Sequence, residues 1–183
     1  MSTIDPLANE QATPEAQATL TAVHAALGLT PNLFRVAANS TAALTGLVGL
    51  NGALGRGSLR AKVREALALD IAQINGCDYC LSAHSALGKA AGLNEADIAA
   101  ARAGEAADPH TEAILRLAGE IVRQRGAIGP DALGRAKAAG VTDAEVVEIV
   151  AHVALNVFTN YLNIVAGTEI DFPVVRAAEL ATV

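Results

Sequence analysis

The sequence predicts an all-α protein, a helical bundle of about nine or ten helices. Alanine and leucine dominate its apolar residues, whereas aromatic residues make up only 3% of the chain. Because alanine and leucine are strong helix formers and aromatic residues favour strands, this composition favours helices. No window alternates apolar and polar residues as a half-buried strand would. Glycine and proline recur where helices would stop and start, beside residues suited to capping.

In the first half of the chain, the expected helices are separated by clear stop and start signals. Thr13-Pro14-Glu15 combines an N-cap, a proline at the first helical position and an acid, and Gly28 ends this helix. Further helices are expected over 30–38, from Ser40 to about 54, and from a cap at Ser58 to Asn75-Gly76. Asn75-Gly76 predicts a break or sharp bend, and the helix after it ends at Gly92.

The second half follows the same pattern. A helix capped by Asn94 is followed by one from Asp108-Pro109 to about 125 and a short one from Gly129-Pro130 to Gly140. Thr142 and Glu145 form a capping box at the start of a long helix that runs to about 166. Asp171-Phe172-Pro173 then leads into a short tail.

Length, charge and hydropathy limit the classes of protein. With 183 residues, the chain fits a single domain over 1–183, with its chemistry at about 58–104. The formal charge is −6 and no Lys/Arg cluster occurs, so the electrostatic footprint of nucleic-acid binding is missing. The start lacks a basic region followed by an apolar one, and no segment approaches the roughly 18 apolar residues of a membrane span. We therefore predict a cytoplasmic protein without a nucleic-acid or membrane partner.

Cys77 and Cys80 are the only two cysteines of the chain. Thiols three residues apart can close a disulfide with little chain movement, and in a reducing compartment such a pair is more often catalytic or metal-binding than structural. On a helix, which turns about 100° per residue, Cys77, Cys80 and His84 fall on one stripe about 60° wide. The cysteines follow Asn75-Gly76, where unpaired N–H groups and the helix dipole favour a thiolate. His84 can take the proton of Cys80 or stabilise its anion.

Glu65 is a candidate proton acceptor that depends on the bend. In one straight helix its side chain would lie on a different face from Cys77 and about 18 Å away. Only a turn at Asn75-Gly76 brings it beside His84 or Cys77. Thiol redox chemistry is therefore the first hypothesis. A metal site built from the two cysteines, His84 and Glu65 is an alternative, although the second C-x-x-C or histidine pair usual for zinc is absent.

The spacing Glu65-x11-Cys77-x2-Cys80-x3-His84 resembles the core motif of the alkyl hydroperoxide reductase D-like (AhpD-like) group within the carboxymuconolactone decarboxylase-like superfamily. The resemblance extends to residues 31–34 and 168–173 and covers nearly the whole chain. It implies an all-helical homo-oligomer, without an organic cofactor, that reduces a peroxide substrate with electrons from an external dithiol. By this resemblance, Cys80 becomes the sulfenic acid, Cys77 is the proton donor and resolving thiol, and Glu65 with His84 forms the proton relay.

Functions other than a thiol peroxidase stay open. The superfamily's name implies decarboxylation of a muconolactone, which is not expected to depend on a cysteine pair. A non-enzymatic oligomer could also sense oxidants through its thiols. Some members of the resembled group have a histidine immediately before the second cysteine, where this chain has Tyr79. A tyrosine cannot buffer protons near neutral pH as a histidine can.

The long helix from Asp143 separates polar from apolar side chains. Its polar side holds Glu145, Glu148, His152, Asn156, Thr159 and Asn163, and its apolar side holds Val147, Val150, Ala154, Val157 and Tyr161. We interpret this pattern as an amphipathic helix with a polar outer face. The alternative is that the polar side forms an interface or the wall of the redox pocket, with His152 as a further site residue.

Overall fold

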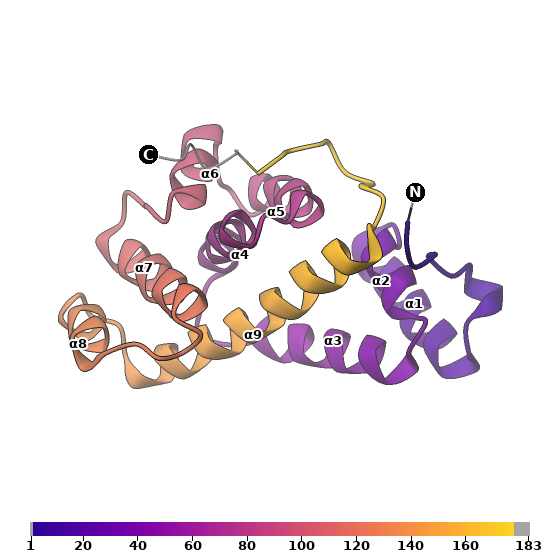
Figure 1. The fold of residues 1–183 in the computed structure, drawn as a ribbon, viewed down its shortest axis with the longest axis horizontal. Coiled ribbons are helices and arrows are strands. Elements are labelled where there is room, and N and C mark those ends of the chain that lie inside the picture. Colours follow the sequence, from indigo (N-terminus) through magenta and orange to yellow (C-terminus); the bar gives the residue numbers. More distant parts are fainter. Residues whose placement is uncertain (1, 178–183) are drawn as a thin grey trace.

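The computed structural model describes residues 2–177, and its regular structure is entirely helical (Figure 1). The predicted all-α bundle is confirmed, with nine α-helices, one short 3₁₀ turn and no strand among these residues. The elements in chain order are η1 (Asn9–Gln11), α1 (Pro14–Leu27), α2 (Asn32–Ala37), α3 (Thr41–Leu54), α4 (Ala61–Asn75), α5 (Asp78–Ala90), α6 (Glu95–Arg102), α7 (Pro109–Arg123), α8 (Pro130–Ala138) and α9 (Asp143–Ala166).

Side-chain caps fix most of the predicted helix starts. In six helices the N-cap side chain accepts a hydrogen bond from a backbone N–H of the first turn; these residues are Thr13, Ser40, Cys77, Asn94, Asp108 and Thr142. The capping box predicted at the start of the long helix is also present. Local sequence therefore sets these starts without help from distant residues.

The start of α4 differs from the prediction that Ser58 caps it. The helix begins at Ala61, and its N-cap residue Arg60 makes no side-chain cap. Instead, the Glu148 carboxylate of α9 accepts hydrogen bonds from the backbone N–H groups of Ser58 (2.9 Å) and Leu59 (3.3 Å). The bond from Ser58 is the main cause of the lowered pKa of Glu148. A contact from a distant helix thus holds both residues outside α4.

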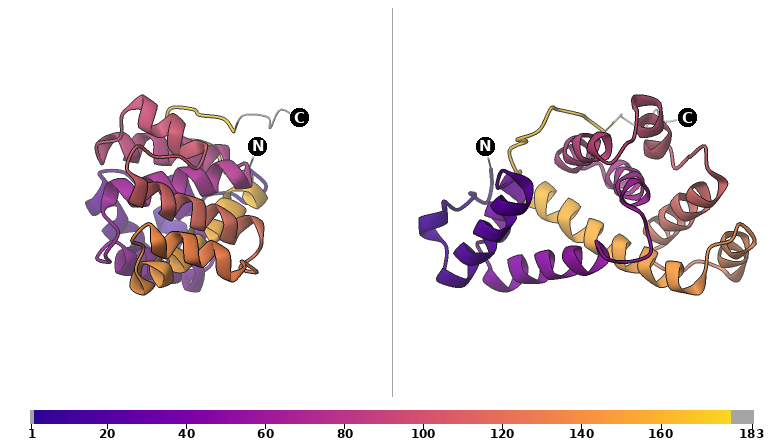
Figure 2. Two further views of the ribbon diagram at one scale, coloured as in Figure 1. Left: turned by 90° about the vertical axis from the view of Figure 1, so that its left-hand side faces the viewer. Right: turned by 180° about the vertical axis from the view of Figure 1, so that it is seen from behind.

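Helix α4 lies at the centre of the described fold, in contact with α5, α6, α7 and α9 (Figures 1 and 2). Its residues 66–72 are all buried. One hydrophobic cluster joins α4 to α5, α7 and α9 and includes Leu67, Leu81 and Leu115. A second cluster, around Leu44, joins α1, α2 and α3 to α9. Because α9 contributes to both clusters, it connects the two ends of the bundle.

The polar side of α9 faces inward. His152, Asn156, Thr159 and Asn163 are buried, whereas Val147, Val150 and Tyr161 are exposed. The interpretation of a polar outer face is therefore wrong. The physical reason is that this side of α9 packs toward α5 and a cavity that contains polar groups, rather than toward an apolar core.

Helix α9 is also long and apolar enough to cross a membrane by length and composition, with a mean hydropathy of 1.4 over 18 residues. On this measure the expectation that no segment approaches a membrane span is wrong. Half of that window is buried inside the fold, as in a helix that passes through a protein core. Most of the buried apolar residues of α9 belong to its two hydrophobic clusters, whereas Val147, Val150 and Tyr161 add to its hydropathy while exposed.

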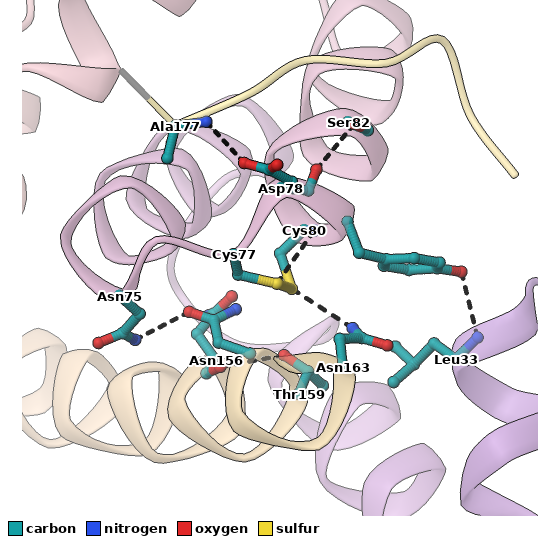
Figure 3. The surroundings of a disulfide bond; sticks show 12 residues. Leu33, Asn75, Cys77, Asp78, Cys80, Ser82, Asn156, Thr159, Asn163 and Ala177 are labelled. Carbon is teal, nitrogen blue, oxygen red and sulfur yellow. Dashed lines mark hydrogen bonds between the residues drawn. A yellow bond between two sulfur atoms is a disulfide. The ribbon is translucent and has the colours of Figure 1, made fainter. Parts of the chain in front are cut away.

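Residues 171–177, here called the C-terminal strap, cross α5 after α9 has ended (Figure 3). The backbone N–H of Val175 donates to Ser82 Oγ at 2.9 Å. Asp78 accepts two further hydrogen bonds, from the backbone N–H of Ala177 (2.8 Å) and from Arg176 Nη1 (2.9 Å). The strap is thereby fixed to the first turn of α5, where the cysteines lie.

Candidate active site

The turn after α4 places the two cysteines at the start of α5. Gly76 ends α4 with φ at 69°, a left-handed conformation that favours glycine. Cys77 is the N-cap of α5, and Cys80 lies in its first turn. Their Cα atoms are 5.3 Å apart, and the sulfurs form a disulfide (Figure 3). The predicted break at Asn75-Gly76 is confirmed, and the sulfurs lie within bonding reach.

Both sulfurs accept hydrogen bonds, but from different donors. Cys77 Sγ accepts one from the backbone N–H of Cys80 at 3.2 Å, as an N-cap side chain does. Cys80 Sγ accepts one from Nδ2 of Asn163 on α9 at 3.4 Å (Figure 3). Both cysteines are almost fully buried, with exposed fractions of 1% and 3%. Hydrogen bonds of this kind stabilise a thiolate that lies away from water.

Glu65 and His84 form a pair across α4 and α5. His84 Nδ1 lies 2.8 Å from Glu65 Oε2. The bend at Gly76 turns α5 back along α4, which is the condition under which Glu65 was expected to reach His84. The carboxylate holds the His84 proton on Nδ1 and leaves Nε2 to exchange a proton elsewhere.

Gly88 allows this close approach of α4 and α5. A Cβ atom at position 88 would lie 3.7 Å from Glu65 Cβ and 2.8 Å from Leu93 Cδ1. A larger side chain at this position would therefore push against Leu93 and α4. A Cβ alone would be in ordinary contact with Glu65, so only a side chain larger than that of alanine would press α5 away from α4.

A cavity of about 350 Å³ lies against Cys80, and residues of α5 and α9 form part of its lining. Its polar lining residues are Arg64, Glu65, Tyr79, Cys80, His84, Asn51, His152, Asn156, Thr159 and Asn163. Its larger apolar lining residues are Leu27, Leu29, Pro31, Leu33, Phe34, Leu47, Leu87, Leu155 and Phe172. A largely apolar cavity with a few convergent polar groups is typical of a small-molecule site.

The structure brings three of the four predicted site residues to one wall. Glu65, Cys80 and His84 line the cavity, whereas Cys77 is bonded to Cys80 and does not line it. The catalytic roles of these residues stay predictions. In residues 2–177, no three His, Cys, Asp or Glu side chains are grouped so as to hold a metal ion.

Helix α9 adds polar groups that motif spacing does not reveal. His152 and Asn163 both line the cavity, so the alternative interpretation of its polar side as a pocket wall is confirmed. His152 Nε2 and Asn163 Oδ1 are buried without a hydrogen-bond partner among the described residues. Burial lowers the pKa of His152, and the nearby charge of Arg64 lowers it further. His152 is therefore neutral at pH 7, because its pKa lies below the ordinary 6.5.

The contacts of Tyr79 join α5 to neighbouring parts of the fold. Its hydroxyl accepts a hydrogen bond from the backbone N–H of Leu33 at 3.1 Å. Its ring meets that of Phe172 edge to face, with 5.9 Å between centroids. Burial raises the pKa of Tyr79 above its ordinary value. The hydroxyl thus stays protonated and fixes α2 and the strap against α5, and it does not replace a titrating histidine.

Residues 40–122 match the Carboxymuconolactone decarboxylase family. The resemblance to the carboxymuconolactone decarboxylase-like superfamily is confirmed. The matched segment contains Glu65, Cys77, Cys80 and His84. No curated protein matches the chain.

Solved structures share the AhpD-like fold over almost the whole chain. An uncharacterized peroxidase-related protein from Ralstonia eutropha JMP134, described as an alkylhydroperoxidase AhpD core, is 19% identical with a TM-score of 0.82, covering 93% of this chain and 92% of that one. A peroxidase-related protein from Silicibacter sp. TM1040 is 20% identical with a TM-score of 0.77, covering 91% and 92%. The debrominase Bmp8 in complex with 2,3,4-tribromopyrrole is 18% identical with a TM-score of 0.78, covering 93% and 92%.

Proposed function

We propose that this protein is a thiol-dependent peroxidase that reduces organic hydroperoxides through Cys77 and Cys80. One observation carries the proposal: Cys80 lies on the wall of a largely apolar cavity that also contains the Glu65–His84 pair. A nucleophile, a proton-transfer pair and room for an apolar group thus adjoin one another.

The first step is attack by the Cys80 thiolate on the terminal oxygen of the hydroperoxide. His84, held by Glu65, takes the proton of the Cys80 thiol. An S–O bond forms, the O–O bond breaks, and the departing alkoxide takes a proton from His84 to become an alcohol. The terminal oxygen keeps its own hydrogen, so that Cys80 becomes a sulfenic acid.

The second step closes the disulfide. Cys77 transfers its proton to His84, and its thiolate attacks Cys80 Sγ; the S–S bond forms and the S–O bond breaks. The departing hydroxide takes the proton from His84 and leaves as water. The Cα atoms of the cysteines are 5.3 Å apart, so this step needs little movement of the chain. An external dithiol then reduces the disulfide by thiol–disulfide exchange and becomes oxidised itself.

A second candidate function is reductive removal of bromine from a small aromatic ring. The observation that favours it is the apolar cavity against Cys80, in a fold shared with a debrominase that binds 2,3,4-tribromopyrrole. In this reaction Cys80 takes bromine from carbon, the carbon takes a proton, and Cys77 displaces bromide to form the disulfide. The two thiols supply the two electrons. Release of bromide from 2,3,4-tribromopyrrole would identify this function.

Anaerobic thiol counting tests the peroxidase proposal. We expect one equivalent of cumene hydroperoxide to consume both thiols of the reduced protein and to yield one equivalent of alcohol. With excess dithiothreitol and hydroperoxide the protein should turn over many times, whereas a sensor would oxidise once and a decarboxylase would leave both thiols intact.

Two cysteine variants assign the roles. Cys80→Ser should abolish turnover, because it removes the nucleophile. Cys77→Ser should leave a sulfenic acid that dimedone traps, because the resolving thiol is gone. Full turnover by the double serine variant would reject the proposal.

A further inference from the structure

The side-chain amide of Asn163, on α9, makes a hydrogen bond to Cys80 Sγ from outside α5. Its Nδ2 donates to the sulfur at 3.4 Å. Figure 3 shows Asn163 reaching from α9 toward the two sulfurs. Asn163 is 3% exposed, so this contact lies away from bulk water. A donor in such a place interacts more strongly with charge than it would at the surface.

The N-terminus of α5 favours charge on Cys77 rather than on Cys80. The backbone N–H of Cys80, in the first turn, donates to Cys77 Sγ, which is the N-cap acceptor. The cysteine that lines the cavity is nevertheless Cys80. A Cys80 thiolate therefore needs another stabilising donor, since an unpaired charge in a buried site is costly. Asn163 Nδ2 is that donor.

The other end of the same amide is free. Asn163 Oδ1 is buried and has no hydrogen-bond partner in the described part of the chain. Buried polar groups without a partner are rare in native proteins and call for an explanation. A hydroperoxide and a sulfenic acid each carry one O–H hydrogen beside the reacting sulfur. An amide oxygen next to Cys80 is a suitable acceptor for that hydrogen.

We propose that Asn163 is a catalytic residue, which stabilises the Cys80 thiolate through Nδ2 and accepts the O–H hydrogen of the hydroperoxide and of the sulfenic acid through Oδ1. This inference rests on the proposed thiol chemistry. The Asn163 amide donates to the nucleophile, orients the terminal oxygen toward it and then holds the sulfenic acid until Cys77 attacks. It gives up no proton and no electrons, so the balance of both steps is unchanged.

The experiment isolates the Cys80 thiol in the Cys77→Ser background. Thiolate absorbance near 240 nm is followed against pH, and the Cys77→Ser/Cys80→Ser double variant supplies the background from the two tyrosines, so that the difference reports Cys80 alone. Charge-assisted hydrogen bonds are worth about 1.5–3 kcal/mol, so Asn163→Ala should raise the pKa of Cys80 by about one to two units. The other titratable groups at the cavity are Arg64, Glu65, Tyr79, His84 and His152, and all are left in place.

Asn160→Ala is the matched control. Asn160 lies on the same helix and is fully buried, and its Oδ1 accepts a hydrogen bond from Asn75 Nδ2 at 2.8 Å, but it makes no hydrogen bond to either sulfur. We expect the Cys80 titration to be unchanged in this variant. An equal shift in both variants, or no shift in Asn163→Ala, would overturn the inference. Far-UV circular dichroism checks folding, and Asn163→Asp, which preserves the shape and adds negative charge, should raise the pKa of Cys80 further.

A second readout tests the acceptor. In the Cys77→Ser background at a pH where Cys80 is fully ionised, the rate of sulfenic acid formation should fall at least about tenfold in Asn163→Ala. Alkylation by iodoacetamide at the same pH should change little, because this reagent has no hydroperoxide O–H to orient. Equal rates of sulfenic acid formation would reject the acceptor role. Absence of peroxide turnover in the wild type would reject the proposed function while leaving the thiol titration as a separate result.

Discussion

The buried carboxyl group of Asp70 should make the stability of this protein depend on pH. Asp70 lies in the middle of α4 and is 2% exposed. Its Oδ2 lacks a hydrogen-bond partner among the described residues, and a Cβ added to Gly119 of α7 would lie 3.1 Å from it. Burial raises the pKa of Asp70 from 3.8 to about 7, although the charge of Arg123 acts in the opposite direction.

The direction of the effect follows from proton binding. Between pH 3.8 and about 7, the folded protein keeps a proton that the unfolded chain has released, so the free energy of unfolding falls as pH rises through this window. The destabilisation is absent below the window and complete above it. A shift from 3.8 to about 7, at about 1.4 kcal/mol per unit, corresponds to on the order of 4 kcal/mol.

Asp70→Asn keeps the shape of the side chain and removes its titration. We expect urea unfolding to show that the wild type loses about 2–3 kcal/mol relative to this variant between about pH 5 and about pH 8. Circular dichroism at 222 nm follows the transition at each pH. Parallel stability curves for the two proteins across this range would refute the reasoning.

A surface acid with the opposite shift provides the control. A hydrogen bond from Lys62 and one from the backbone of Asn94 lower the pKa of Asp97 below 3.8. Its contribution to stability is therefore present above that value and is lost only in more acidic solution. The Asp97→Asn variant should therefore lose as much free energy of unfolding as the wild type between about pH 5 and about pH 8.

Three further predictions concern the redox site. Glu65→Gln should lower peroxidase turnover about a hundredfold or more with little loss of fold, because it removes one member of the proton-transfer pair. An unchanged pH–rate profile would show that Glu65 takes no part in the proton relay. Asp78→Ala should loosen the strap, which Val175 still ties to Ser82, and speed reduction of the disulfide by a protein dithiol more than by dithiothreitol. Equal acceleration by both would argue against a steric role of the strap. Gly88→Val should separate α4 from α5, and so lower both turnover and the free energy of unfolding, the latter by about 1–3 kcal/mol. Wild-type values of both quantities would contradict the close approach of α4 and α5 at Gly88.

Short-range sequence signals predicted most of the helix starts and the bend that positions the site. The caps at Ser40, Asn94 and Thr142 are local interactions, and the sequence contains both of their partners. The bend at Gly76 was also predictable, because a glycine after a helical stretch is the usual residue for a left-handed helix end. With that bend, Glu65 was expected beside His84 or Cys77, and the structure places it beside His84.

Long-range contacts set what the sequence did not predict. Ser58 has the side chain of a good N-cap, but Glu148 of α9 binds its backbone N–H and α4 begins later. Nothing near Ser58 in the sequence indicates that a carboxylate from another helix lies beside it. Tertiary contacts of this kind override local capping preference.

The inward polar side of α9 has the same origin, and it bears directly on function. A helix with one polar and one apolar side can turn its polar side either toward solvent or toward the interior. Periodicity alone does not distinguish these two arrangements. The polar side faces inward here because it meets Cys80 and a cavity, where Asn163 Nδ2 donates to Cys80 Sγ and His152 lines the wall. The consequence is that Val147, Val150 and Tyr161 are exposed on the described chain. The expected homo-oligomer stays a prediction, and an apolar side turned outward is the surface on which such an assembly would place its contacts.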